Sequence, residues 1–342
     1  MALAMPEAAQ AATKSVFLGV PPANQKAFEN AVSDVNAFFP GNVRIHTGDV
    51  VSFEPVGFHS VDMPRSGAPL PLVSPTGKKI AGLLDAAGVP FWFNAGAEPG
   101  FDKRLLKSNF GRTLVKRSTR ITSGLPLADK PKPMKVRFNK AGLHTYFCNV
   151  HPGMKGTVRV VGRRSPVPSA KSDAARVKSQ AAKALAAAKA LPKNTKPPAN
   201  TISVGAEGKG GVSYFGMLPD TLTVPAGTTV NFTMPSGSTD VHTATFGPGD
   251  AEKKDTYLGA LAASLQGVAF DGRAAYPSEQ PGLPPVGLSP ALHGNGFWNT
   301  GIMDALAASP LLAAGSVTFT TPGTYPYVCL IHPFMKGTVT VQ

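Results

Sequence analysis

The chain has 342 residues, a length that predicts about two domains. Charged residues make up only 16% of it, whereas Gly and Pro number 36 and 33, a balance that favours all-β domains with long loops over helical bundles. The net charge of +14 is uneven: +10 in residues 1–162, +8 in 163–202 and −4 in 203–342. Since no zinc-finger or RNA-recognition motif accompanies it, this charge predicts an acidic protein partner docking on the first domain or the linker, and no nucleic acid.

The N-terminal segment Met1–Thr13 lacks both the basic start and the full apolar core of an intact secretory signal. We expect it to be what remains after a signal peptide has been removed. No apolar run in the chain reaches the roughly 18 residues that a membrane span needs, so none is predicted.

Two segments of the first half are repeated in the second half. Pro40–Phe53 aligns with Pro219–Phe232 at an offset of 179, and both segments predict a strand, a glycine turn and a second strand. Val136–Val160 aligns with Val317–Val341 at an offset of 181, with the alternating apolar residues of strands on both sides of a loop. These repeats predict two β domains, residues 1–162 and 203–342.

Long Gly- and Pro-rich middles separate the matched ends of each half, and they hold Trp92 and Trp298, which we interpret as packing residues. Residues 163–202 form a basic linker rich in Ala, Lys and Pro. Its stretch Ala170–Leu191 predicts a helix with Ser172 as a cap. The linker is either an ordinary solvated helix or a surface that binds a partner.

A Cys-x2-His-x2-Met motif stands in the loop of each repeated segment, and a histidine follows a strand 87 to 89 residues upstream. Two His, one Cys and a weak axial Met form the ligand set of a blue-copper electron-transfer site, because the soft sulfur donors favour Cu(I) while imidazole binds both oxidation states. Each element alone is weak evidence, but the combination occurs twice. The predicted metal ligands are His59, Cys148, His151 and Met154 in the first half, and His242, Cys329, His332 and Met335 in the second.

With these motifs the chain resembles a tandem cupredoxin, and its CLIHPFMKG loop is similar to the ligand loop of amicyanin and plastocyanin-like proteins. The resemblance implies two eight-stranded Greek-key β-sandwiches joined by the partly helical linker, with one type 1 copper at one end of each. It also implies single-electron transfer between redox protein partners through His151 and His332, with Pro152, Pro333 and Phe334 around those outlets.

This chain departs from the family at Ser60 and Thr243, where related proteins often carry Asn directly after the first ligand histidine. A hydroxyl at these positions is still able to contact the cysteine sulfur or to tie the two ligand loops together. Since hydrogen bonds around the ligands tune a copper site, the reduction potentials do not follow from the family.

Three histidines remain outside the predicted sites. We interpret His46 and His144 as structural, because neither position is a histidine in both halves. His293 has no counterpart in the first half, and a role as a ligand of a third metal stays open for it.

Three functions compete on this evidence. An electron carrier with two type 1 coppers is favoured, acting outside the cytoplasm in the periplasm or as a secreted protein. The alternative is a two-domain copper oxidoreductase of the nitrite reductase or small multicopper oxidase type, which needs an additional catalytic copper and, commonly, His-x-His pairs that this chain lacks. Copper storage or delivery ranks lower. Because their domains differ in charge, the two sites are predicted to differ in partner or potential.

Overall fold

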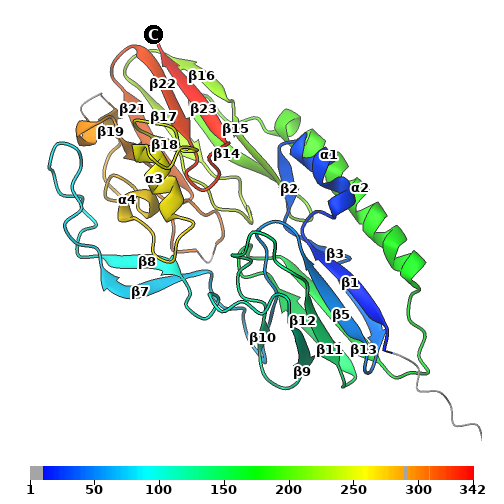
Figure 1. Cartoon of the computed structure of the whole chain (residues 1–342). Coiled ribbons are helices and arrows are strands. Elements are labelled where there is room, and N and C mark those ends of the chain that lie inside the picture. Colours follow the sequence, from blue (N-terminus) through cyan, green and yellow to red (C-terminus); the bar gives the residue numbers. More distant parts are fainter. Residues whose placement is uncertain (1–10, 289–291, 308) are drawn as a thin grey trace, which may run out of the picture. The chain divides into compact units, whose positions relative to one another are not determined.

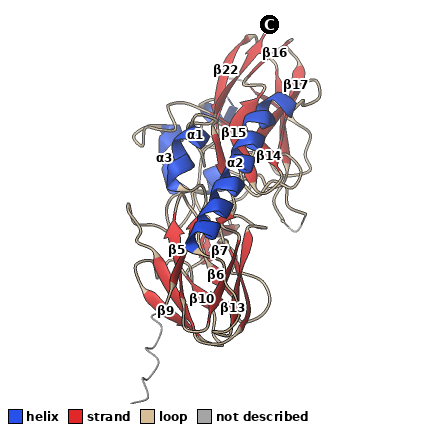
Figure 2. Cartoon of the chain, turned by 90° about the vertical axis from the view of Figure 1, so that its right-hand side faces the viewer, coloured by secondary structure: helices blue, strands red, loops and turns tan. Residues whose placement is uncertain are grey.

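The computed structural model describes residues 11–288, 292–307 and 309–342. Strands dominate it, and helices are few (Figure 2). The described residues form two compact units that are discontinuous in sequence: the first comprises residues 11–24, 37–70 and 107–182, and the second 25–36, 71–106 and the described part of 183–342. The all-β prediction is confirmed. No helix in the described part of the chain is long and apolar enough to cross a membrane.

The first unit is a sandwich of two five-stranded sheets, in the orders β3-β1-β5-β11-β9 and β10-β6-β12-β13-β4 (Figure 1). This is two strands more than the eight expected, since the sheets include short two-residue strands. The bounds are β1 Thr13–Leu18, β3 Phe38–Phe39, β4 Asn42–His46, β5 Val50–Pro55, β6 Asp62–Met63, β9 Thr113–Lys116, β10 Ile121–Thr122, β11 Met134–Phe138, β12 Gly142–Phe147 and β13 Lys155–Val161; the 3-10 turn η1 is Pro22–Asn24.

The second unit has a six-stranded sheet, β19-β21-β17-β14-β15-β2, a five-stranded sheet, β16-β23-β22-β18-β20, and the separate pair β7-β8. Its bounds are α1 Gln25–Glu29, β2 Ser33–Val35, β7 Val73–Lys79, β8 Ala97–Phe101, β14 Thr201–Gly208, β15 Val212–Leu218, β16 Thr221–Val224, β17 Thr228–Thr233, β18 Thr245–Phe246, α3 Tyr257–Ser264, α4 Gly272–Ala275, β19 Val286–Leu288, η2 Leu292–Gly294, β20 Trp298–Asn299, β21 Ala314–Phe319, β22 Gly323–Val328 and β23 Lys336–Val341.

Both cores grow from the repeated segments. Buried and more exposed residues alternate along β13 and β23, so each strand turns one face inward, as the apolar alternation predicts. Tyr146 packs edge-on against Phe38 and Phe53 in the first core. Cys148 and Met154 belong to the same buried cluster, which means that the loop between them is anchored directly on the core.

Two segments from the first half of the sequence complete the second unit. Strand β2 pairs antiparallel with β15 and extends its sheet. In residues 71–106, Phe101 packs edge-on against Phe270 at 5.1 Å, and the Trp92 indole nitrogen donates a hydrogen bond to the Pro277 carbonyl. Trp92 is still 40% exposed, whereas Trp298 lies in the core, 3% exposed; both act in packing.

The helix predicted in the linker is α2, Ala170–Asn194, and it ends three residues later than expected. Its cap is Ser169 and not Ser172: the Ser169 hydroxyl accepts a hydrogen bond from the Ser172 N–H. The difference arises because the helix begins at Ala170, which puts Ser172 inside the first turn. The boundary between the two compact units falls within α2.

Candidate metal centres

A short loop between two core strands carries Cys148, His151 and Met154. It leaves β12 and enters β13, and it is closed by two backbone hydrogen bonds, from Cys148 N to Met154 O at 3.0 Å and from Met154 N to His151 O at 3.1 Å. Paired strands thus hold both ends of the loop, and the sequence from Cys to Met folds back on itself. The three side chains are brought to one end of the sandwich.

The loop in the second unit is built the same way, between β22 and β23. Cys329 N donates to Met335 O at 3.0 Å, and Met335 N donates to His332 O at 2.8 Å. Met154 and Met335 are almost fully buried, at 2% and 1% exposure. The equal Cys-x2-His-x2-Met spacing thus gives the two loops the same backbone hydrogen bonds.

The upstream histidines complete two groups that could hold a metal ion, His59 with Cys148 and His151, and His242 with Cys329 and His332. The structure therefore brings six of the eight predicted ligands together as two triads, and places each methionine at the end of its own loop.

The donor atoms have the spacing that a single ion requires. In the first triad the two histidine Nδ1 atoms are 3.0 Å apart, and the cysteine sulfur lies 3.7 and 4.0 Å from them. In the second the corresponding distances are 3.1, 3.8 and 3.8 Å. Triangles with these edges have a centre about 2.1 Å from all three atoms, and metal bonds to His nitrogen and Cys sulfur measure about 2.0 to 2.3 Å. The donor set thus fits a copper ion.

A glycine supports the upstream histidine in each unit. Gly19 has a φ of +100°, and a Cβ at this position would lie 2.8 Å from two atoms of the His59 ring. Gly205 has a φ of +86°, and a Cβ there would lie 3.0 Å from Nε2 of His242. Neither glycine was predicted from the sequence, although both end similar tripeptides, Phe17-Leu18-Gly19 and Ser203-Val204-Gly205. The register of β14 shifts at Gly205, a bulge that glycine permits.

The residues after the upstream histidines hold the sulfur and tie the loops together. The Ser60 N–H points at the Cys148 sulfur at 3.5 Å, and the Ser60 hydroxyl accepts a hydrogen bond from the Asn149 N–H at 2.8 Å. The Thr243 N–H points at the Cys329 sulfur at 3.3 Å, and its hydroxyl accepts from Leu330 N–H at 2.8 Å. The tie between loops expected of these hydroxyls is confirmed.

Burial and hydrogen bonds act against each other on the pKa of the two thiols. Burial raises the pKa of the Cys148 thiol, but hydrogen bonds and charge from His151 and His59 outweigh it and hold the pKa well below its usual value. Burial raises the pKa of Cys329, and hydrogen bonds from Thr243 and the backbone offset only part of that rise. A bound cation favours the thiolate in both sites.

The surroundings of His242 in the second site disfavour the protonated, charged form of its imidazole. Burial and the neighbouring His332 lower the pKa of His242 to about 3, and Asp240 offsets part of the shift. His242 is therefore neutral over the ordinary pH range, with a lone pair free for a metal, as a ligand must be.

The loop histidines reach the surface in different surroundings. The Phe215 ring stacks on His332, with centroids 4.8 Å apart and planes inclined by 24°. Phe334 lies on the same side, 56% exposed, and contacts both rings. In the first unit His151 is followed by the exposed residues Pro152 and Gly153. A larger apolar surface therefore surrounds His332 than His151.

The three remaining histidines do not join either triad. The Nε2 atom of His46 lies 2.8 Å from the Ser165 carbonyl oxygen, a structural contact. His144 packs against Phe138, and burial lowers its pKa.

His293 lies between two carboxylates in the second unit. Its Nδ1 is 3.5 Å from Asp85 and its Nε2 is 3.2 Å from Glu279, so the acids contact opposite edges of the ring. One ion cannot be bound by such a set. Within residues 11–288, 292–307 and 309–342 the two triads are the groups of three His, Cys or acidic residues with metal-ligand spacing.

One comparison with known proteins supports a cupredoxin-like fold. No protein-family model matches the chain. Amicyanin-alpha of Methylorubrum extorquens AM1 is 63% identical over 27 residues, which are 8% of this chain and 23% of that protein. The match thus spans less than a quarter of the curated relative. Together with the two-sheet sandwiches, it confirms the cupredoxin-like fold expected from the sequence.

Solved structures of amicyanin and plastocyanin are also similar. A reduced Cu(I) form of an amicyanin variant covers 44% of this chain and 90% of its own, at 20% identity and a TM-score of 0.22. Oxidised plastocyanin from Dryopteris crassirhizoma covers 42% and 99%, at 22% identity and a TM-score of 0.21. Similarity at this level does not define a function.

Proposed function

We propose that the chain is an electron-transfer protein that binds two type 1 copper ions, one at each triad. The observation that carries the proposal is the duplicated triangle of two imidazole nitrogens and one thiolate sulfur, each with a centre about 2.1 Å from its corners and a methionine closing the same loop. The ligands are His59, Cys148, His151 and Met154 in the first site, and His242, Cys329, His332 and Met335 in the second.

Copper, when bound, supplies a one-electron couple, and the protein supplies rigidity. Paired strands on both sides of each loop, the upstream histidine on its glycine support and the N–H groups aimed at sulfur all fix the donors before the metal arrives. A fixed donor set changes little between oxidation states, which suits fast electron transfer. The same rigidity disfavours copper delivery, for which ligands have to open.

Electrons enter and leave through the loop histidines His151 and His332, which are the partly exposed members of the triads. Their redox partners are other proteins. The first domain, with its charge of +10, and the basic linker suit an acidic partner. As an electron carrier of this kind, the protein is proposed to work outside the cytoplasm, in the periplasm or after secretion.

The test is copper reconstitution of the full chain. We expect two coppers per chain and an intense visible absorption from thiolate-to-copper charge transfer. Cys148→Ser and Cys329→Ser each remove half of the metal and of the absorption, and the double variant removes both. His46→Gln is the control, since that histidine lies outside the triads. Colourless Cu(II) protein contradicts the proposal, and a third tightly bound copper favours an oxidoreductase instead.

A further inference from the structure

The same pair of reciprocal hydrogen bonds lies beside both candidate sites, and we call the segments that it joins the frame of each site. In the first unit Val61 N–H donates to the Ser123 hydroxyl at 2.8 Å, and Ser123 N–H donates back to the Val61 carbonyl at 2.8 Å. In the second unit Ala244 and Thr300 exchange the same two hydrogen bonds, at 2.9 and 3.1 Å. Residues 60–62 thus correspond to 243–245, and 120–123 to 297–300, so that the surroundings of the two sites can be compared position by position.

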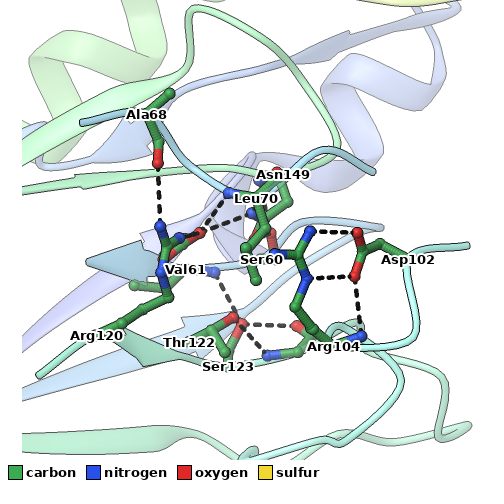
Figure 3. Close-up of polar contacts among 12 residues, drawn as sticks. Ser60, Val61, Ala68, Leu70, Asp102, Arg104, Arg120, Thr122, Ser123 and Asn149 are labelled. Atoms are coloured by element: carbon green, nitrogen blue, oxygen red, sulfur yellow. Dashed lines mark hydrogen bonds and ion pairs between the residues drawn. The ribbon is translucent and has the colours of Figure 1, made fainter. Parts of the chain in front are cut away.

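A charged network occupies this frame in the first unit (Figure 3). Asp62 is fully buried, and its Oδ2 accepts hydrogen bonds from Leu70 N, from Asn149 Nδ2 and from the Arg120 guanidinium. Asn149 in turn accepts from the Ser60 hydroxyl at 2.9 Å. This hydroxyl lies 3.8 Å from the sulfur of Cys148. A continuous chain of contacts therefore runs from Arg120 and Asp62 to the metal-binding thiolate.

The second unit has neutral residues at the same positions. Thr245 takes the place of Asp62, and Phe297, fully buried, takes the place of Arg120. Leu330 follows the cysteine where the first unit has Asn149. The Thr245 hydroxyl donates to Asn299 at 2.8 Å and lies 2.9 Å from the hydroxyl of Thr243. Among the described residues, no ionised side chain is hydrogen-bonded to the Thr243 or Thr245 hydroxyl.

Burying the Asp62 carboxylate has a cost that one counter-charge only partly offsets. Its Oδ1 is buried and has no hydrogen-bond partner among the described residues. Arg120 is the cation in contact with it, and its side chain is 30% exposed; Lys116 is a further cation near enough to interact with Asp62. A buried ion pair is not an efficient way to stabilise a fold, since apolar replacements often serve as well. Phe297 and Thr245 are such replacements in this chain.

We propose that Asp62 and Arg120 are positioning residues whose opposite charges set the reduction potential of the first copper site independently of the second. The inference rests on the proposed function. The Asp62 carboxylate favours the more positive oxidised ion and lowers the potential, whereas the Arg120 guanidinium opposes it, because charges act strongly at short range in a buried environment. Through Asn149 and Ser60 the pair also holds the thiolate in place.

Opposite charge changes should therefore move the first potential in opposite directions. We expect Asp62→Asn to raise it and Arg120→Gln to lower it in redox titrations followed by the charge-transfer absorption. Titrations of the full chain and of the Cys329→Ser background assign the signal to the first site. The second potential should stay at its wild-type value in both variants. Arg120→Lys retains the charge, so its first potential should stay close to the wild-type value.

Two exposed residues of the first unit serve as matched controls. Asp129→Asn and Arg159→Gln make the same charge changes at the surface and should leave both potentials unchanged, because water screens them. Shifts in the same direction for Asp62→Asn and Arg120→Gln indicate loosened packing only and overturn the proposal, as do shifts equal to those of the controls.

The proposed function and this inference can be tested separately. Copper content and the wild-type absorption are measured first, and a first triad that binds no copper overturns both. If Asp62→Asn or Arg120→Gln does not fold, it is replaced by the double change Asp62→Thr with Arg120→Phe, which introduces the residues found at the same positions of the second unit. Removing both charges should bring the first potential closer to the second. No movement towards the second potential contradicts the proposal.

Discussion

Gly19 lies directly against the imidazole of His59, so close that a Cβ at this position would come within 2.8 Å of both Cδ2 and Nε2 of the ring. Real side chains do not tolerate such an approach to a ring held from all sides, and His59 is 1% exposed. The glycine therefore limits where the ring of His59, one of the proposed metal donors, can lie. Gly205 has the same relationship to His242 in the second unit.

We expect Gly19→Ala to weaken copper binding at the first site at least tenfold, because the methyl group displaces His59 from the donor triangle. The backbone strain of alanine at positive φ is about 1 kcal/mol and is a separate effect. Gly67→Ala is the matched control: Gly67 has a φ of +78° and no atom within 4 Å of its added Cβ. Copper titration of both variants separates the two effects, and equal affinities would show that the contact with His59 is unimportant.

The two core tyrosines predict a contrast in stability. The Tyr146 hydroxyl donates to the Gly41 carbonyl at 3.3 Å, whereas the Tyr327 hydroxyl is buried with no partner among the described residues. A hydrogen bond contributes about 1 kcal/mol, and an unsatisfied buried hydroxyl costs about as much or more. Tyr146→Phe should therefore lower the free energy of unfolding, and Tyr327→Phe should leave it unchanged or raise it. Chemical denaturation monitored by circular dichroism measures both, and a larger loss for Tyr327→Phe refutes this assignment.

Much of the site could be predicted from sequence because the relevant information is local. The spacing from Cys148 to Met154 fits a loop between two strands, and repetition made the upstream histidines stand out. The network of Asp62 and Arg120 could not be predicted, since their contact joins residues 58 positions apart. Asp62 lies on the two-residue strand β6 and Arg120 directly precedes the two-residue strand β10, and strands this short show no sequence pattern. The correspondence of Ile121–Gly124 with Trp298–Gly301 was missed for the same reason.

Which segments belong to each compact unit could not be predicted, because nothing in the sequence shows which core an insertion packs against. Residues 25–36 and 71–106 belong to the second unit, although they precede most of the first. Side chains such as Phe101 and Phe270 meet across 169 positions of sequence, and no periodicity records that. A contiguous division at residues 162 and 202 still keeps each ligand set in one half.

This organisation predicts that a change in the first half destabilises the second unit. Phe101 is 7% exposed and packs on Phe270, so Phe101→Ala should cost the second unit about 3 kcal/mol. The copper absorption of the second site should then be lost at lower temperature, with that of the first unchanged. Cys148→Ser and Cys329→Ser backgrounds allow each site to be followed alone. Leu143→Ala, at an exposed position of the first unit, is the control. A loss confined to the first site contradicts the prediction.

A half-buried carboxyl group in the second unit, that of Glu207, predicts how stability changes with pH. Glu207 accepts hydrogen bonds from Ser213 and Thr239, and Asn36 joins this cluster to Asp240. Burial raises the pKa of Glu207 from 4.5 to about 7; its hydrogen bonds oppose the shift, and the negative charge of Asp240 adds to it.

Because the folded protein holds this proton more tightly than the unfolded chain, the contribution of Glu207 to stability is present below pH 4.5 and lost as the pH rises towards 7. The shift corresponds to about 3 kcal/mol at most, and partial exposure reduces it to about 1 to 2 kcal/mol. Glu207→Gln removes the charge and should abolish this decline, leaving the variant more stable than wild type above pH 7. Denaturation at several pH values measures the difference. Glu29→Gln, an exposed carboxyl in the same unit, should follow the wild-type curve. If Glu207→Gln follows it too, Glu207 is ionised in the folded protein well below pH 7.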